Sequence, residues 1–244
     1  MLTLGRAQLC VHQAFSRLLS TSACRMQHAQ LSDLPEDQCI LVDKNDKVIG
    51  EEAKSTCHIV SPDGNLLLHR AFSVFLFNSK GDLLLQKRAS AKVTYPDHYT
   101  NTCCSHPLST IPAEMIETDA LGIRNAAQRR LQIELGVPPE QAKPEEMVWL
   151  TRIHYMDRGD GKFGEHEIDY ILFLQKDVDL DLNPDEVSEV KYVKREELKS
   201  FLTNLNEPVT PWFDLIAKNQ LPTWWDNLHQ LHKFYDHKTI HRYV

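Results

Sequence analysis

Two adjacent cysteines precede a histidine in the segment 101–108, which reads Asn-Thr-Cys-Cys-Ser-His-Pro-Leu. The Asn, Ser and Pro around Cys103 and Cys104 suit a loop better than the interior of a helix or strand. A thiol can act as a nucleophile, an acid–base group or a metal ligand, and imidazole is the commonest metal ligand. Two buried structural cysteines would produce the same octapeptide, so the segment becomes informative only together with other residues.

Residue types that bind metal ions recur along the chain. His58 and His69 flank the start of a predicted strand, and His106 follows the cysteine pair. Glu165 and Glu167 begin another predicted strand, where positions i and i+2 share a face, so both carboxylates can reach one ion while the histidine between them points away. Three imidazoles and two carboxylates suit a divalent ion, with Zn²⁺, Mn²⁺ and Mg²⁺ all compatible. Spacing alone does not show that the five converge, and each histidine by itself fits a surface or core position.

These residues need a scaffold, and the hydrophobic pattern predicts a mixed α and β domain. The segments 71–77 and 83–86 form a hairpin around the turn 78–81. The clearest helix is 119–135, where apolar residues recur at helical spacing before Gly136. Strands followed by a helix, then strands followed by helices, favour an α+β or mixed α/β fold. Further predicted strands are 39–42, 48–50, 147–155, 168–174 and 190–193, and further predicted helices are 195–202, 211–218 and 224–234.

The composition limits the classes of partner. With 27 basic and 34 acidic side chains in 244 residues, the net charge is −7, so the chain has no general attraction for nucleic acid or an anionic membrane. No apolar run approaches the roughly 20 residues that span a bilayer. The six cysteines match no disulfide scaffold, and reduced thiols are expected. An anionic small-molecule substrate would therefore need a local cluster of Lys and Arg.

The first 32 residues differ from the rest of the chain. They contain three arginines and no Asp or Glu, and they can form an amphipathic helix. This composition predicts a mitochondrial presequence, with a disordered tail as the alternative. Met26 offers a second start, which would leave the product in the cytoplasm. The folded part is predicted to be 39–244, and the C-terminal residues do not form a convincing peroxisomal signal.

Three motifs make the chain resemble the type I isopentenyl-diphosphate Δ-isomerases. They occupy 68–73, 101–107 and 164–170, and the Thr210-Pro211-Trp212 and Trp224-Trp225-Asp226 segments support them. The resemblance runs from about Cys39 to the C-terminus. It implies a Nudix-type α/β/α sandwich with a mixed sheet, and the conversion of isopentenyl diphosphate to dimethylallyl diphosphate in isoprenoid and sterol biosynthesis. We expect a monomer with a small diphosphate substrate.

The Nudix helix of this chain is degenerate. The segment 129–136 keeps Glu134 and Gly136 of the family pattern, whereas Arg130 and Ile133 stand where hydrolases carry glutamates. Loss of the carboxylate cluster argues against the first alternative, a Nudix pyrophosphohydrolase. A second alternative is a non-catalytic nucleotide-binding Nudix module, which would have no need of an acid–base set. The resemblance implies that Glu134 holds one Mg²⁺ bound to the substrate diphosphate.

The resemblance also implies a role for each remaining candidate. A 1,3-proton shift through a tertiary carbocation needs an acid on one face of the alkene and a base on the other. Cys104 is expected on one face, Glu167 and Tyr155 on the other, and the ring of Trp212 beside the cation. His58, His69, His106, Glu165 and Glu167 are expected to bind one further divalent ion. Lys54, Arg88, Lys92 and Arg130 match phosphate-contacting positions.

Overall fold

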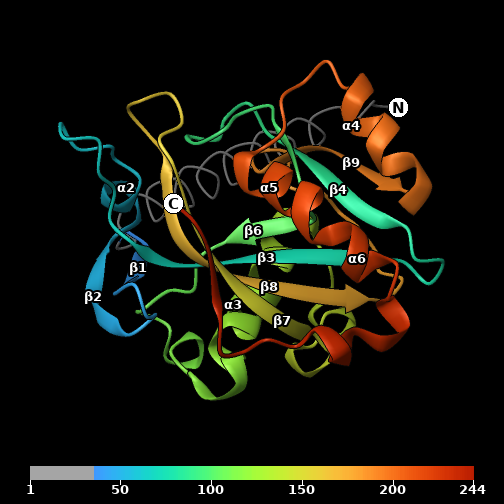
Figure 1. The fold of residues 1–244 in the computed structure, drawn as a ribbon, viewed down its shortest axis with the longest axis horizontal. Coiled ribbons are helices and arrows are strands. Elements are labelled where there is room, and N and C mark those ends of the chain that lie inside the picture. Colours follow the sequence, from blue (N-terminus) through green and yellow to red (C-terminus); the bar gives the residue numbers. More distant parts are fainter. Residues whose placement is uncertain (1–35) are drawn as a thin grey trace, which may run out of the picture. The chain divides into compact units, whose positions relative to one another are not determined.

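A mixed β-sheet forms the centre of the fold. The computed structural model describes residues 36–244, so the predicted presequence lies outside the described residues. The central strand order is β10-β7-β8-β3-β1-β2, and β4 and β6 also pair with β3, while β5 and β9 pair with β4 (Figure 1). The strands are β1 (Gln38–Val42), β2 (Val48–Ala53), β3 (His69–Phe77), β4 (Leu83–Arg88), β5 (Tyr99–Thr100), β6 (Cys103–Ser105), β7 (Val148–Asp157), β8 (Glu165–Gln175), β9 (Val187–Val193) and β10 (Ile240–Tyr243).

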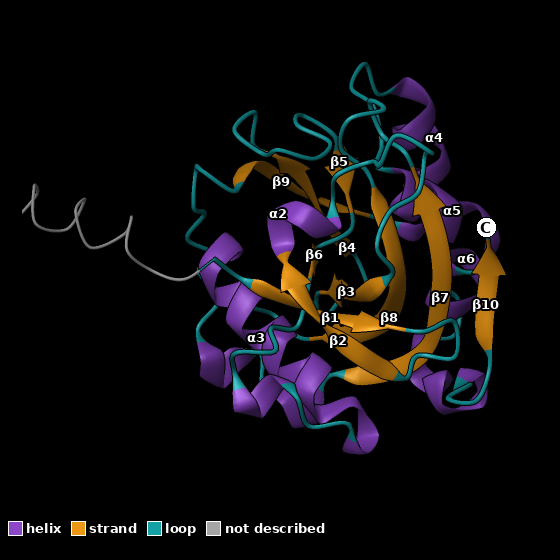
Figure 2. Cartoon of the chain, turned by 90° about the vertical axis from the view of Figure 1, so that its left-hand side faces the viewer, coloured by secondary structure: helices purple, strands orange, loops and turns teal. Residues whose placement is uncertain are grey.

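Helices cover both faces of this sheet. Figure 2 shows α3 on one side of the sheet and α5 and α6 on the other. Along β3, Phe72, Val74 and Leu76 pack in the core that includes α3, whereas Phe75 and Phe77 pack in the core that includes α5 and α6. A strand covered on both faces is mostly apolar, and β3 is apolar from Ala71 to Phe77 except at Ser73. The helices are α2 (Lys54–Cys57), α3 (Leu121–Leu135), α4 (Leu198–Asn204), α5 (Pro211–Asn219) and α6 (Leu221–Trp225).

The mixed α/β fold class is confirmed, and several predicted boundaries are wrong. The segment 101–108, expected as a loop, contains β6, because Cys104 pairs with Ser73 of β3. The predicted helix 224–234 is instead the end of α6 followed by a 3₁₀ helix, Leu228–Phe234. Asp119 and Ala120 adopt left-handed backbone angles, so α3 begins only at Leu121. No helix within 36–244 is long and apolar enough to cross a membrane.

Gly136 ends α3 in the left-handed conformation that glycine adopts without strain. A Cβ at this position would lie 2.3 Å from the backbone oxygen of Asp181, so the chain beyond the helix also needs glycine here. The sharp stop allows the segment after α3 to return toward the sheet. Glu134, in the last turn of α3, is thereby held at a fixed distance from β4, and its carboxylate accepts a hydrogen bond from Gln86 at 3.1 Å.

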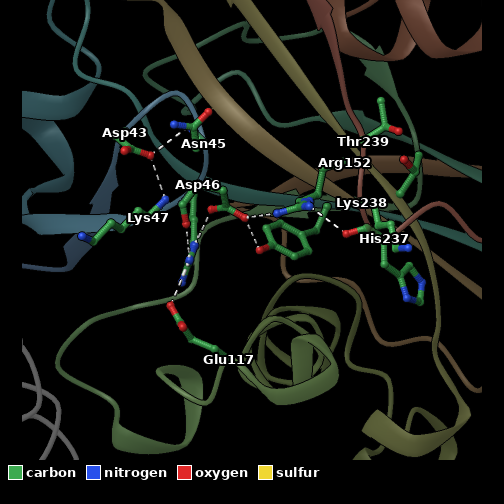
Figure 3. A network of polar contacts seen from close by, with 12 residues as sticks. Asp43, Asn45, Asp46, Lys47, Glu117, Arg152, His237, Lys238 and Thr239 are labelled. Atoms are coloured by element: carbon green, nitrogen blue, oxygen red, sulfur yellow. Dashed lines mark hydrogen bonds and ion pairs between the residues drawn. The ribbon is translucent and has the colours of Figure 1, made fainter.

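A buried polar network connects five parts of the fold (Figure 3). Asp46, in the β1–β2 turn, binds Arg70 of β3 at 2.7 Å and Arg152 of β7 at 2.9 Å. The hydroxyl of Tyr170 on β8 donates to the same carboxylate. Arg152 also donates to the carbonyl oxygen of His237 at 2.8 Å. The network therefore joins the first strands to the C-terminal segment through one buried aspartate.

Candidate active site

Five buried side chains converge at one end of the central strands. The ligand atoms of His58, His69, His106, Glu165 and Glu167 all lie within 4.8 Å of one another. His58 follows α2, His69 begins β3, His106 follows β6, and the two glutamates begin β8. Parallel pairing of β3 with β8 places His69 directly opposite Glu167, which explains how residues so far apart in the sequence meet.

Backbone carbonyls orient two of the three imidazoles. The Nδ1 of His58 lies 2.7 Å from the oxygen of Lys54, and the Nδ1 of His69 lies 2.9 Å from the oxygen of Leu67. Because a carbonyl only accepts, each Nδ1 carries a proton, and each Nε2 faces the cluster. His58 Nε2 lies 2.9 Å from Glu165, and His69 Nε2 lies 3.6 Å from Glu167.

The buried carboxylates of the cluster favour a cation on or between the imidazoles. Burial lowers the pKa of His58, but Glu165, the backbone carbonyl of Lys54 and Glu167 together raise this pKa to about 9. The carboxylate therefore draws a cation to this position, either a proton or a metal ion. The pKa of His106 moves the other way, well below its usual value, because of burial and its two histidine neighbours. His69 Nε2, which faces the cluster, is buried without a hydrogen-bond partner, as expected for a nitrogen available to an ion. The donor set fits a divalent metal ion.

Glu167 also belongs to a candidate acid–base pair. Antiparallel pairing of β7 with β8 places Tyr155 opposite Glu167, and the Tyr155 hydroxyl donates to Glu167 Oε2 at 2.5 Å. The other oxygen, Oε1, lies 2.9 Å from His106 Nε2. Burial alone would raise the pKa of Glu167, but His69 and Tyr155 hold it below its usual value. One carboxylate thus connects the ion cluster to the tyrosine.

The two cysteines face different surroundings. Cys103 is fully buried in the core that includes α3. Cys104 is half-buried and packs against the other core, with its Sγ 3.9 Å from an Arg88 nitrogen. Burial raises the pKa of Cys104 to about 12, although Arg88 opposes this shift. Cys104 is therefore a protonated thiol at neutral pH.

Trp212 lies beside these groups. Its indole nitrogen donates to Asn101 at 3.1 Å, which fixes the ring. The ring centroid is 6.3 Å from that of Tyr155 and 5.7 Å from the guanidinium carbon of Arg88. The predicted aromatic residue is therefore close to both the tyrosine and the arginine of the site.

The four predicted phosphate-binding cations do not share one partner. Arg130 binds Glu134 in its own helix at 2.6 Å and Glu186 at 3.0 Å, and Lys92 also binds Glu186. Arg88 instead donates to the carbonyl oxygen of Thr94 at 2.7 Å. Burial, followed by the charges of Arg130 and Lys92, lowers the pKa of Lys54. Lys54, Lys92 and Arg130 therefore lie in one region of the site, whereas Arg88 has other partners.

Sequence reasoning missed several polar residues of the site. Glu186 precedes β9 in an acidic loop, and no pattern marked it. Asp169 is buried on β8, where Ser73 donates to it at 2.8 Å. Burial raises the pKa of Asp169 well above its usual value. The alternation that identified Glu165 and Glu167 continues to Asp169 and could have found it.

A cavity of about 390 Å³ lies next to Trp212. Its lining includes Tyr95, Asp157 and Phe163. The Tyr95 hydroxyl donates to Asp157 at 2.5 Å, and its ring meets that of Trp212 edge-on at 5.2 Å. Tyr95 therefore contacts both the outer cavity and the aromatic wall of the site.

Comparisons with known proteins identify the family of this chain. Residues 67–213 match the NUDIX domain. Isopentenyl-diphosphate Delta-isomerase 1 of Bos taurus is 52% identical over 212 residues, covering 86% of this chain and 93% of the relative. Isopentenyl-diphosphate Delta-isomerase I of Clarkia breweri is 52% identical over 215 residues, covering 85% of this chain and 75% of the relative.

Solved structures agree on the fold alone. A NUDIX hydrolase from Alicyclobacillus acidocaldarius superposes with a TM-score of 0.51 at 8% identity, covering 69% of this chain and 97% of that one. A Deinococcus radiodurans protein superposes with a TM-score of 0.50 at 15% identity, covering 75% of this chain and 99% of that one. Together with the curated relatives, these matches confirm the resemblance and the Nudix fold. The chain belongs to the isopentenyl-diphosphate Delta-isomerase family and carries its NUDIX domain.

Proposed function

We propose that this protein converts isopentenyl diphosphate to dimethylallyl diphosphate by a 1,3-proton shift through a tertiary carbocation, within isoprenoid and sterol biosynthesis. The observation that carries the proposal is the acid–base set. A protonated thiol at Cys104 and a hydrogen-bonded Tyr155–Glu167 pair lie around Trp212 in a chain of this family. A binding module would have no use for this combination.

The proton shift divides between the two sides of the set. One group donates a proton to the terminal alkene carbon, which produces the tertiary cation, and the other removes a proton from the neighbouring methylene. Cys104 serves one face of the alkene, and Glu167 with Tyr155 serves the other. In the reverse reaction the two groups exchange roles. The indole face of Trp212 stabilises the cation through its quadrupole.

Two cation sites accompany this chemistry. His58, His69, His106, Glu165 and Glu167 would hold one divalent ion, Zn²⁺, Mn²⁺ or Mg²⁺. A cation bound there would fix the orientation and tune the acidity of Glu167. Glu134 would hold Mg²⁺ that arrives with the diphosphate. Lys54, Arg88, Lys92 and Arg130 bind the diphosphate oxygens by charge-assisted hydrogen bonds.

The degenerate Nudix helix supports isomerisation over hydrolysis. Arg130 occupies a position where a hydrolase has a glutamate, and its guanidinium binds Glu134 at 2.6 Å. The surviving carboxylate is thereby paired with a cation, rather than with further carboxylates that could hold several metal ions. This arrangement suits the binding of an intact diphosphate.

The decisive experiment incubates purified protein with isopentenyl diphosphate and Mg²⁺. An isomerase forms an acid-labile allylic diphosphate without releasing phosphate. Release of inorganic phosphate or of a monophosphate would instead identify a hydrolase. Absence of both products, with retained ligand binding, would identify a binding module.

We also propose where the protein acts. Residues 1–32 would direct at least part of the product to mitochondria, a start at Met26 would leave it in the cytoplasm, and the domain 39–244 would act as a monomer. The composition of the first 32 residues supports this, since the first carboxylate is Asp33.

A further inference from the structure

Glu186 lies among the cations that would bind the substrate. One of its carboxylate oxygens is 3.0 Å from Arg130, and the other binds Lys92. The two partners come from different elements, α3 and the loop after β4. A single half-buried carboxylate thus bridges two proposed diphosphate ligands, one oxygen to each.

We propose that Glu186 is an internal counter-anion of the diphosphate site, displaced when the diphosphate of the substrate binds. The inference rests on the proposed function, because it takes Lys92 and Arg130 to be diphosphate ligands. Its role is to hold and position these cations in the free enzyme and to set the affinity for diphosphates.

The charges of the region require such an anion. Lys92 and Arg130 bind Glu186 directly, Lys54 lies near both of these cations, and Arg130 is more than nine-tenths buried. Like charges in a partly desolvated pocket repel one another, and the lowered pKa of Lys54 reflects this repulsion as well as burial. Glu134 compensates the charge of Arg130, so a second carboxylate is needed for Lys92.

Glu186 remains charged throughout the working range of pH. Burial alone would raise its pKa, but Arg130 and Lys92 lower it to about 2. The carboxylate therefore competes with any incoming anion at neutral pH. Lys87, one residue before Arg88, points elsewhere and binds Glu207 at 3.0 Å, so it does not relieve this competition.

The backbone around Glu186 is fixed while its side chain has room to leave. Its carbonyl oxygen accepts a hydrogen bond from Ala89 at 3.0 Å, and the next residue, Val187, pairs with Arg88. The side chain is half-buried, and the flanking Asp185 is exposed. A diphosphate can therefore take the place of the carboxylate by a side-chain rotation, without moving β9.

The test measures binding of inorganic diphosphate by calorimetry, without Mg²⁺ and without turnover. In Glu186→Gln the competing charge is gone, so the dissociation constant should fall at least about tenfold, the effect of one charge-assisted contact. Glu146→Gln is the matched control, because Glu146 forms an exposed ion pair with Lys176 at 2.7 Å outside the site. Its dissociation constant should equal that of the wild type. An unchanged or increased value in Glu186→Gln would overturn the proposal.

Two further measurements exclude a purely structural role. Glu186→Asp keeps the charge on a shorter side chain, and its dissociation constant should lie between those of the wild type and the Gln variant; this variant also carries the test if Glu186→Gln fails to fold. In steady state, KM for isopentenyl diphosphate should fall in Glu186→Gln while kcat does not rise. A fall in kcat at constant KM would contradict displacement. Failure of isomerisation in the wild type would refute the proposed function while leaving the diphosphate titration readable.

Discussion

The assignment of the catalytic thiol can be tested at a single pair of residues. Cys104→Ala should lower kcat by about 10³ or more, because it removes a group that exchanges a proton with the substrate. Cys103→Ala removes a fully buried sulfur that packs with α3, and it should cost about 1 kcal/mol of stability with little change in kcat. Steady-state kinetics and denaturant unfolding of both variants provide the measurement. The opposite distribution of effects would transfer the role to Cys103.

A second residue-scale prediction concerns the ion cluster. His69→Ala should lower the divalent metal bound per chain and abolish turnover, because it removes one of five converging ligands. His166→Gln is the control: it lies between the two glutamates, but its Nδ1 faces the oxygen of Leu66 at 2.9 Å, away from the cluster. Elemental analysis after gel filtration measures the metal. Full occupancy in His69→Ala would remove it from the proposed ligand set.

Residue-scale reasoning from sequence succeeded where local geometry decides. The spacing of Glu165 and Glu167 is enough to put both on one face of a strand, whichever strand pairs with it. Spacing alone did not predict that His58, His69 and His106 converge, because this depends on parallel pairing of β3 with β8 and on the return of β6 beside β3; only the family resemblance implied it. Glu186 was not predicted, because it lies in an acidic loop whose sequence gives no sign of the cations that contact it in the fold.

A chain of hydrogen bonds through two neutral histidines connects Arg242 of β10 to β7 and β8. Since His166 Nδ1 donates to Leu66, His166 Nε2 accepts from His154 Nε2 at 2.9 Å. His154 Nδ1 is then free to accept from Arg242 of β10 at 2.7 Å. This arrangement exists only while His154 is neutral. Burial, His166 and Arg242 lower the pKa of His154 to about 4.

Low pH should therefore weaken the hydrogen bonds that connect β10 to β7 and lower the free energy of unfolding. A histidine whose folded pKa lies below the ordinary 6.5 adds stability above pH 6.5 and loses it as pH falls from 6.5 toward 4. With screening at a partly exposed site, about 1 kcal/mol should be lost between pH 7 and pH 5. Urea unfolding of wild type and His154→Gln at both values isolates this contribution. An identical pH loss in the two proteins would contradict the assignment.

Element boundaries failed where tertiary contacts override local preference. The segment 224–234 has helical spacing, yet it divides into α6 and a 3₁₀ helix, because Trp225 turns inward to donate to Gly81 at 2.7 Å. Strand β6 has three residues and loop-like composition, and pairing with β3 alone makes it a strand. The long strands β3 and β8 were predicted, because strands that are buried on both faces consist mainly of apolar residues.

At the scale of the whole molecule, the buried Asp46 binds side chains from three different strands. Asp46→Asn should lower the free energy of unfolding by about 3 kcal/mol, because Arg70 and Arg152 would lose a buried counter-charge. Glu117→Gln is the control, since Glu117 is a largely exposed second partner of Arg70 and should change stability by about 0.5 kcal/mol or less. Equal losses of unfolding free energy in the two variants would show that the buried network contributes no more than an exposed ion pair.

The N-terminal segment should be dispensable for catalysis. A chain that starts at Met26 keeps every proposed site residue, the first of which is Lys54, so its kcat and KM should match those of the full chain. Residues 1–32 fused to a fluorescent reporter should carry it to mitochondria. A reporter that stays in the cytosol would remove the targeting proposal without affecting the enzyme.

The parallel contact between His69 and Glu167 also determines when the protein can acquire its ion. These residues are roughly 100 positions apart, and contacts at such separation form late because loop closure opposes them. During synthesis, the three imidazoles leave the ribosome well before either glutamate. A nascent or partly folded chain therefore lacks a complete coordination set, and metal content becomes a measure of how many molecules have finished folding.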